Sequence, residues 1–179
     1  MIIPRVVHTA HLRPDELAPI RGLLDLAFAG GFADGDWNHA LGGLHIMATE
    51  DDEVIAHAAV VQRQLVHDDR PIRTGYVEAV AVHPQRQGRG YGATIMGEVG
   101  RVIHAAYDLG ALSSSEGVEG FYRSCGWLAW RGPTGVLAPT GTTLTPDDDD
   151  SVFVLAVASK VPVRVTGTLV CDWRDGDVW

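Results

Sequence analysis

The chain has 179 residues, of which 46% are hydrophobic and 21% are charged, and its formal net charge is −9. This composition excludes disordered, fibrous and low-complexity proteins, and the length suits one domain with a sizeable core. We therefore expect residues 1–179 to form a single domain. The acidic balance repels phosphate backbones and anionic lipid surfaces, so we expect no nucleic-acid or membrane partner and favour a cationic one.

Neither a targeting segment nor a metal-binding pattern stands out in the sequence. No apolar run approaches the roughly 20 residues of a membrane-spanning helix, and the start, Met1 to Arg5, lacks a basic segment followed by an apolar one. We expect a soluble, cytoplasmic protein. The two cysteines and eight histidines show no metal-ligand spacing, so we expect no metal site.

The first half of the chain predicts one helix and three strands. A proline and two acidic residues at 14–16 are typical of a helix start, apolar residues then recur at helical spacing, and Gly30-Gly31 ends the segment. Residues 32–37 are expected to form a loop or begin a short helix. Segments 44–50, 54–66 and 72–83 are separated by acidic turns and predict an antiparallel meander.

The second half begins with a glycine-rich segment, 85–92, which follows Pro84 and leads into a helical pattern ending near Ala106. Beyond it we expect a short strand at 109–112, a short helix at 115–123 and extended chain at 127–130. Two more strands are expected at 152–157 and 161–165. The predicted fold class is α/β in the α+β sense, a mostly antiparallel sheet covered by a few helices.

The glycine-rich segment is a candidate anion site. Unpaired backbone amides and the positive end of a helix converge where a strand leads through a glycine loop into a helix. Glycines at 88, 90 and 92 let the backbone approach phosphate oxygens, and Arg86 and Arg89 add positive charge. Diphosphate is the natural ligand of such a site. The alternative is a helix start that merely requires flexible residues.

Two phosphate-binding motifs compete for this segment. Gly88-x-Gly90-x-x-Ala93 fits the dinucleotide fingerprint, but that motif needs a parallel strand unit and an acidic residue about 20 positions later. The preceding strand belongs to a meander, and residues 113–115 are serines. No GK[ST] follows, which excludes a P-loop. The spacing Gln87-x-x-Gly90-x-Gly92 instead resembles the pyrophosphate signature of the GNAT superfamily, the acetyl-CoA-dependent N-acetyltransferases.

The resemblance extends through the second half of the chain. Phe121-Tyr122, followed by Gly126-Trp127, resembles the Tyr-x-x-x-Gly-aromatic motif of GNAT enzymes. Further blocks resemble the aminoglycoside 2'-N-acetyltransferases, namely residues 75–82, 109–115, 136–141, 145–149 and 171–179, with a weaker match at 33–43. The resemblance implies a GNAT fold with acetyl-CoA as co-substrate. It implies contacts to coenzyme A from Val80, Val82, Gln87, Gly88, Arg89, Gly90, Tyr91 and Gly92.

Two residues are candidates for the chemistry of acetyl transfer. Glu78 lies in an apolar stretch that would make its carboxylate a better proton acceptor, and the resemblance implies that it is the general base. Its alternative role is a solvent-facing residue of a half-buried strand. The resemblance implies that Tyr122 is the general acid toward the thiolate, the alternative being a packing aromatic. It also implies that the backbone of Val80 and Val82 pairs with pantetheine, and the amide near Val80 is a candidate oxyanion donor.

Acidic residues gather in three places, 34–36, 147–150 and 172–177. Such runs are usually solvated loops, but a cleft lined by carboxylates attracts polycations such as aminoglycosides. The choice among the four aspartates at 147–150 is open. The resemblance assigns acceptor binding to Asp36, Ser113, Asp148, Asp177 and the terminal carboxylate of Trp179.

The expected function is therefore acetyl transfer from acetyl-CoA to the 2'-amine of aminoglycosides by direct attack of the amine, an antibiotic-resistance activity. One alternative keeps the chemistry but changes the acceptor to a polyamine or a cell-wall amino sugar. Another is a non-catalytic GNAT module that binds acyl-CoA, although the presence of both Glu78 and Tyr122 argues against it. We also expect a homodimer.

Overall fold

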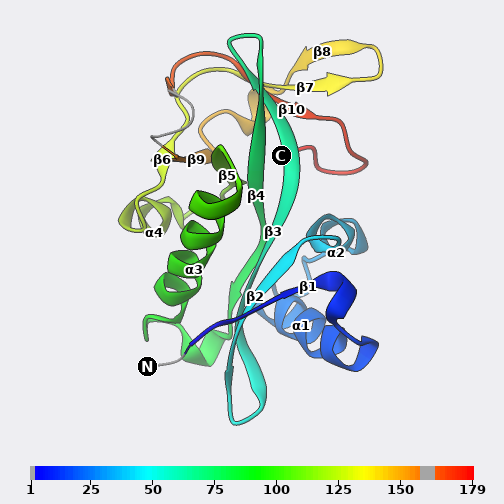
Figure 1. Ribbon diagram of the computed structural model, residues 1–179, viewed down its shortest axis with the longest axis vertical. Helices are drawn as coiled ribbons and strands as arrows, with labels where there is room; N and C mark the ends of the chain where they lie inside the picture. Colours follow the sequence, from blue (N-terminus) through cyan, green and yellow to red (C-terminus); the bar gives the residue numbers. More distant parts are fainter. Residues whose placement is uncertain (1–2, 158–163) are drawn as a thin grey trace. The chain divides into compact units, whose positions relative to one another are not determined.

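The computed structural model describes residues 3–157 and 164–179. The chain divides into two compact units, one formed by Met1–Val61 with Val77–Arg101 and the other by Gln62–Tyr76 with Val102–Trp179. Strands β3 (Glu53–His67) and β4 (Arg70–Val82) and helix α3 (Tyr91–Ala106) contribute residues to both units. Figure 1 labels these elements along the chain. That the whole chain is one domain stays a prediction.

Besides the first part of α3, the first unit contains one helix of 14 residues and one of 7, together with an antiparallel group of strands. Its further elements are β1 (Arg5–His8), the 3-10 turn η1 (Thr9–His11), α1 (Pro14–Ala27), α2 (Asp34–Ala40) and β2 (Leu44–Glu50). Helix α1 begins at the predicted proline, with Asp15 and Glu16 in its first turn. Strand β2 pairs with both β1 and β3. The apolar face of α1 packs in one core cluster, whose buried members are Leu12, Ile20, Leu23, Leu24, Phe32, Met47 and Ala81.

The three strands of the predicted meander are confirmed, and their two turns are made without glycine. Asp51 and Asp52 have φ angles of 50° and 64°, and Asp68 and Asp69 have φ angles of 50° and 61°. Two-residue hairpin turns of type I′ need positive φ at both positions, and aspartate tolerates it better than most residues. The acidic pairs in the sequence therefore mark the positions of both turns.

The second unit contains a short helix and most of the shorter strands. Its further elements are β5 (Leu109–Ser113), α4 (Glu119–Ser124), β6 (Leu128–Ala129), β7 (Thr134–Ala138), β8 (Gly141–Leu144), η3 (Pro146–Asp148), β9 (Val152–Ala156) and β10 (Leu169–Asp172). Most pairings are antiparallel, as predicted, and only β4 with β5 and β7 with β10 pair in parallel among the strands described. Along the hydrogen-bonded path the strand order is β6-β9-β5-β4-β3-β10-β7-β8.

Several short strands differ from the prediction. Strands β7, β8 and β10 were not foreseen, because each has only four or five residues and lacks a clear alternation of apolar and polar side chains. The strand expected at 161–165 falls mainly outside the described residues, and Val165 lies in a turn. The argument that a meander strand excludes a parallel unit was wrong, since β4 uses its second edge to pair in parallel with β5.

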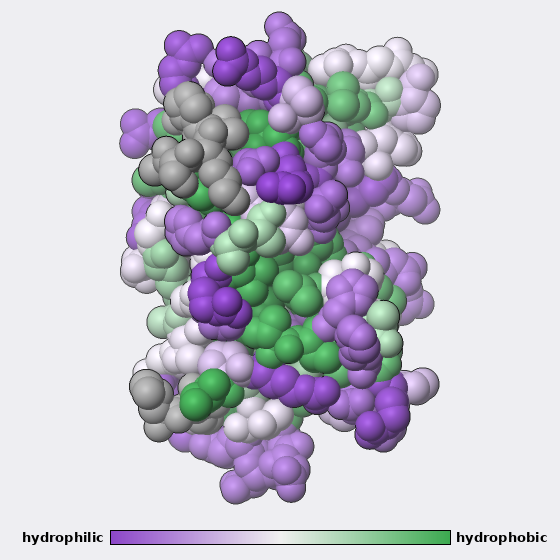
Figure 2. Space-filling view, viewed as in Figure 1, coloured by the Kyte–Doolittle hydropathy of each residue, from purple (hydrophilic) through white to green (hydrophobic). Residues whose placement is uncertain are grey.

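The surface is mostly polar, but some large apolar side chains are exposed. In the view of Figure 2, hydrophobic residues gather near the middle of the face and hydrophilic residues border them. Large hydrophobic side chains that remain exposed include Leu128, Leu137, Leu144 and Trp173. None of the helices in residues 3–157 and 164–179 combines the length and the apolar character needed to cross a bilayer.

Two paired glycines let the end of α3 approach the sheet closely. Gly75 on β4 lies opposite Gly110 on β5. A Cβ atom on Gly75 would lie 2.6 Å from the Tyr107 ring, and one on Gly110 would lie 2.8 Å from Ile103 Cδ1. Both distances are shorter than real contacts of this kind, so side chains at these positions would push the helix end away.

We expect Gly75→Ala to lower the free energy of unfolding by about 1–3 kcal/mol through overpacking. Gly97→Ala is the matched control, because a Cβ there meets no atom within 4 Å. Replacing glycine inside a helix should stabilise the control by about 0.5–1 kcal/mol. Urea unfolding measures both variants, and a Gly75→Ala midpoint at or above that of the wild type would contradict the close packing.

Candidate active site

The end of β4 that belongs to the first unit has an unusual backbone. Glu78, Ala79 and Val80 are half-buried, and Ala81 is buried. Ala79 has a φ of 52°, a left-handed conformation that non-glycine residues rarely adopt. Its carbonyl oxygen lies 2.8 Å from Nδ1 of His57 on β3. The predicted base and the predicted oxyanion donor therefore flank a strained residue whose carbonyl is held by a side chain.

The glycine-rich loop has the backbone geometry expected of an anion site. Gly88 and Gly90 have φ angles of 73° and 87°, and a Cβ at either position would meet open space. Residues 87–90 are exposed, and α3 begins directly after them at Tyr91. The first amides of a helix have no partner within the helix, so they are available to a ligand. The predicted order of strand, glycine loop and helix is confirmed.

Glu50, at the end of β2, contacts one residue on each side of this loop. Its carboxylate lies 2.7 Å from Arg86 Nε and accepts a hydrogen bond of 3.0 Å from the Tyr91 hydroxyl. The bond from Tyr91 and the nearby arginines hold the pKa of Glu50 below its usual value. Glu50 partly neutralises Arg86, which leaves the exposed Arg89 as the better placed cation for a phosphate. Sequence reasoning missed Glu50, since nothing local connects it to the loop.

Tyr122 lies on α4 and is almost completely buried. Its ring packs 5.2 Å from Phe121 and 5.9 Å from Phe153, measured between ring centroids. Burial, with a smaller effect of Cys125, raises the pKa of the Tyr122 phenol to about 12. The hydroxyl therefore keeps its proton at neutral pH, as a general acid must. The two roles considered for Tyr122 are compatible, because the ring packs while the hydroxyl stays protonated.

The four aspartates at 147–150 have different surroundings and therefore different roles. Asp149 Oδ1 accepts two hydrogen bonds of 2.8 Å from Thr134, one from the backbone amide and one from the hydroxyl, and so it holds β7. Asp147 and Asp150 are exposed. Asp148 is half-buried, and its pKa is raised first by burial and then by the charge of Asp177. Asp148 is thus the member whose charged form is disfavoured by burial and a neighbouring carboxylate, although a hydrogen bond from Thr145 favours it.

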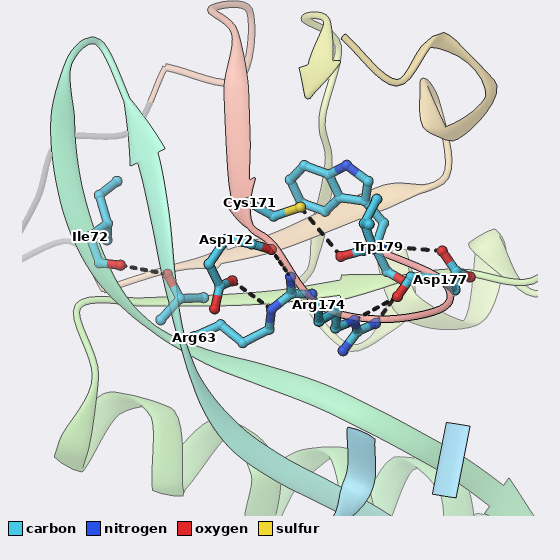
Figure 3. A network of polar contacts seen from close by, with 9 residues as sticks. Arg63, Ile72, Cys171, Asp172, Arg174, Asp177 and Trp179 are labelled. Atoms are coloured by element: carbon cyan, nitrogen blue, oxygen red, sulfur yellow. Dashed lines mark hydrogen bonds and ion pairs between the residues drawn. The ribbon is translucent and has the colours of Figure 1, made fainter. Parts of the chain in front are cut away.

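The last residues of the chain fold back around Arg174 (Figure 3). Arg174 Nε donates to the main-chain oxygen of Asp177 at 2.6 Å, and Nη2 donates to that of Trp179 at 3.0 Å. The Trp179 indole is buried and donates to Thr145 Oγ1 at 3.0 Å, while its backbone amide donates to Asp177 Oδ1 at 3.2 Å. Sequence reasoning anticipated a packed Trp179 but missed Arg174, whose partners are main-chain atoms that no motif reveals.

A second arginine fixes the strand that carries this segment. Arg63 is buried and donates to Asp172 through Nε and Nη2, each at 2.8 Å, to the carboxylate and the main-chain oxygen respectively (Figure 3). The guanidinium of Arg63 lies 4.6 Å from the centroid of the Tyr76 ring, and that of Arg174 lies 5.5 Å from it. These cation–π contacts join β3, β4 and the C-terminal segment within the second unit.

The predicted site residues fall into two groups, one in each unit. Glu78, the loop and Asp36 belong to the first unit, where Asp36 Oδ2 accepts the Ala33 amide at 2.9 Å and caps α2. The second unit contains Tyr122 and Ser113, whose hydroxyl lies 3.2 Å from that of Ser151. It also brings together Asp148, Asp177 and Trp179. Within the described residues, no group of three potential metal ligands is found.

Comparison with known proteins identifies the family. Residues 9–129 match the model of the acetyltransferase (GNAT) domain. The chain is 48% identical over 177 residues to an aminoglycoside 2'-N-acetyltransferase of Mycolicibacterium fortuitum, covering 98% of this chain and 91% of the relative.

Solved structures agree on the fold. The GNAT protein YhbS of Escherichia coli, in complex with CoA, has a TM-score of 0.64 at 16% identity, covering 96% of this chain and 91% of that one. A GNAT acetyltransferase of Brucella melitensis, in complex with acetyl-CoA, has a TM-score of 0.58 at 20% identity, covering 93% and 94%. With the strand, glycine loop and helix described above, these findings show that the chain belongs to the GNAT acetyltransferase family.

Proposed function

We propose that this acetyltransferase transfers the acetyl group of acetyl-CoA to the 2'-amine of aminoglycosides, with the amine attacking the thioester directly. The observation that carries the proposal is the 48% identity, over nearly the whole chain, to an aminoglycoside 2'-N-acetyltransferase. The half-buried Asp148 near the charge of Asp177 supports it, because neighbouring carboxylates favour a polycation. A polyamine or cell-wall amino sugar as acceptor, and a module without catalysis, have no comparable support.

Acetyl-CoA fits the residues of the loop. The positive φ angles of Gly88 and Gly90 and the first amides of α3 suit a diphosphate, and Arg89 adds a charge. Bound acetyl-CoA supplies the activated acetyl group as a thioester. Gln87, Tyr91 and Gly92 complete the proposed diphosphate site, and the backbone groups of Val80 and Val82 would hold the pantetheine arm.

Three groups of the chain would carry the chemistry. Glu78 accepts a proton from the substrate's ammonium group, directly or through water, and the neutral amine then attacks the thioester carbon. The Val80 amide donates to the oxygen of the thioester as negative charge develops there. As the C–S bond breaks, Tyr122 gives its proton to the departing thiolate, and the second proton that the new amide nitrogen loses restores the phenol. The raised pKa of the buried phenol keeps its proton in place beforehand.

The acceptor would be held by carboxylates and a hydroxyl. Asp148 and Asp177 bind ammonium groups, with contributions from Asp36 and Ser113, and the main-chain oxygen of Trp179 is a further acceptor. That oxygen already receives a hydrogen bond from Arg174, so the arginine fixes its position and reduces its negative charge. The side-chain carboxylates therefore supply most of the attraction for the cation. A homodimer and a cytoplasmic location stay predictions.

The function is tested by offering acetyl-CoA with three kinds of amine, namely aminoglycosides, linear polyamines and amino sugars of the cell wall, and detecting products by mass spectrometry. We expect a singly acetylated aminoglycoside as the main product. Preferential acetylation of a polyamine or amino sugar would overturn the acceptor proposal. Coenzyme A binding without turnover of any amine would overturn the proposal of catalysis.

Gly90→Glu should abolish acetyl-CoA binding, because it brings bulk and negative charge to the backbone that a phosphate approaches. The new side chain would project into open space, but the left-handed backbone of Gly90 makes any side chain there strained, so circular dichroism first checks that the variant is folded. Gly97→Glu is the control, with the same charge two turns farther along α3, about 10 Å away. Isothermal titration calorimetry measures the affinity of both variants for acetyl-CoA. Equal affinities of the two variants would exclude the loop as the diphosphate site.

Tyr122→Phe should lower kcat by about 10²–10⁴-fold, as loss of a general acid typically does. The phenyl ring retains the packing against Phe153, so stability should change little. Because the raised pKa of about 12 keeps the phenol protonated, Tyr122 should cause no loss of wild-type rate as the pH rises to about 10. A Tyr122→Phe enzyme with undiminished kcat would show that another group protonates the thiolate.

The acceptor corner should have a characteristic pH dependence. A raised pKa means that Asp148 becomes neutral, on acidification, at a higher pH than an ordinary aspartate, and the KM for the aminoglycoside should then rise. Asp177→Asn removes one cause of that shift, so the rise should move to lower pH.

At neutral pH, Asp177→Asn should raise KM by about tenfold or more, since hydrogen bonds to charged groups contribute about 1.5–3 kcal/mol. Asp150→Asn, an exposed neighbour in the same acidic run, is the control and should leave KM nearly unchanged. Initial-rate measurements across the acidic range test both effects. If the two variants behave alike, the acceptor is not bound by Asp177.

A further inference from the structure

Four groups of the first unit form one continuous hydrogen-bonded chain that ends at the strained residue of β4. Thr9 Oγ1 lies 2.8 Å from His45 Nε2, His45 Nδ1 lies 2.9 Å from His57 Nε2, and His57 Nδ1 lies 2.8 Å from the carbonyl oxygen of Ala79. Both imidazole rings are completely inaccessible to solvent. The acetyl-transfer steps described above use neither histidine, and sequence reasoning considered them only as metal ligands.

The register of β2 and β3 explains why the two rings meet. Met47 pairs with His57 and His45 pairs with Ala59, so the two histidines lie on the same face as diagonal neighbours. Their ring centroids are 5.2 Å apart. A buried pair of histidines in a core is costly unless its polar atoms are satisfied, and here all four ring nitrogens have a partner.

The direction of every hydrogen bond in this chain follows from its last member. A carbonyl oxygen only accepts, so His57 Nδ1 must carry a hydrogen and donate it to Ala79. Burial lowers the pKa of His57 to about 3 and that of His45 to about 4, so both rings are neutral. His57 Nε2 therefore accepts from His45 Nδ1, and His45 Nε2 accepts from the Thr9 hydroxyl at 2.8 Å, in preference to the Gly43 carbonyl oxygen, which lies 3.2 Å from that hydroxyl. The Gly42 amide completes the chain by donating to Thr9 Oγ1 at 3.0 Å.

This series of hydrogen bonds determines the direction in which the Val80 amide points. The described part of the chain contains no cis peptide bond, so the Ala79 carbonyl and the Val80 amide lie on opposite sides of one planar group. An Ala79 oxygen held toward His57 directs the Val80 N–H away from β3. We propose that His57, fixed by His45 and Thr9, is a positioning residue that aims the Val80 amide at the thioester oxygen of acetyl-CoA. This inference rests on the proposed role of Val80 as oxyanion donor.

The alternative is that the histidines only fill the core. A packing role predicts that changes at His57 alter stability without a specific effect on the chemical step. A positioning role predicts a loss of kcat, with acetyl-CoA affinity retained because the diphosphate loop is unchanged. Loss of an oxyanion donor typically lowers kcat by about 10²–10³-fold, so a misdirected Val80 amide should have an effect toward the lower end of that range.

The test is the infrared stretch of the thioester carbonyl of bound acetyl-CoA, labelled with ¹³C at that carbon. In the wild type, hydrogen bonding should lower this frequency below that of free acetyl-CoA. In His57→Leu the lowering should largely disappear and kcat should fall by about 10²-fold. His57→Asn should restore much of both, because its Nδ2 takes the place of the ring Nδ1 and donates to Ala79. Met47→Leu is the core control and should retain the wild-type frequency.

The outcomes distinguish a failure of the oxyanion role of Val80 from a failure of the positioning role of His57. If wild-type enzyme leaves the carbonyl frequency at its free value, the oxyanion role of Val80 is wrong, and the positioning role fails with it. If the wild type lowers the frequency and His57→Leu lowers it equally, only the positioning role is overturned. Should His57→Leu not fold, Thr9→Val removes the hydroxyl that anchors His45 at the far end of the hydrogen-bonded chain, and it should weaken the frequency shift and kcat in parallel. Unchanged values in folded Thr9→Val would then overturn the proposal.

Discussion

The left-handed backbone of Ala79 is the constraint on which the proposed chemistry depends. A non-glycine residue in this conformation typically costs about 1–3 kcal/mol and persists only where its surroundings enforce it. Here Ala79 packs against the core cluster of the first unit, and its carbonyl accepts a hydrogen bond from a buried histidine. Glu78 precedes it and Val80 follows it, so the same distortion sets the directions of the proposed base and the proposed oxyanion donor.

Charge is distributed so that an acidic protein can bind both an anion and a cation. Near the glycine loop, Glu50 lies between Arg86 and Tyr91 and fixes the flanks of the loop, while the backbone amides and Arg89 remain for the diphosphate. In the second unit, Asp149 accepts hydrogen bonds from Thr134, whereas the half-buried Asp148 has a pKa raised by burial and by the charge of Asp177. Some charged groups are thus paired within the protein, and others remain to bind the ligands.

Local patterns predicted the elements that are long and regular. Periodicity and the bordering proline and glycines located α1, and the acidic pairs located both turns of the meander. The short strands β7, β8 and β10 escaped prediction, because tertiary pairing rather than local pattern defines them. The motifs singled out the loop and Tyr122 as candidates, but His57 and Glu50 contact residues 22 and 41 positions away. A single sequence contains no signal for such contacts.

The central claim is that this GNAT enzyme acetylates one particular amine, the 2'-amine of an aminoglycoside. The most direct measurement compares two aminoglycosides that differ only at the 2' position, one bearing an amine and the other a hydroxyl, with the acetylated product identified by NMR. The account predicts that the amine compound is acetylated at the 2' nitrogen and that the hydroxyl compound is not turned over. Acetylation of the hydroxyl compound at another amine, at a comparable rate, would contradict it.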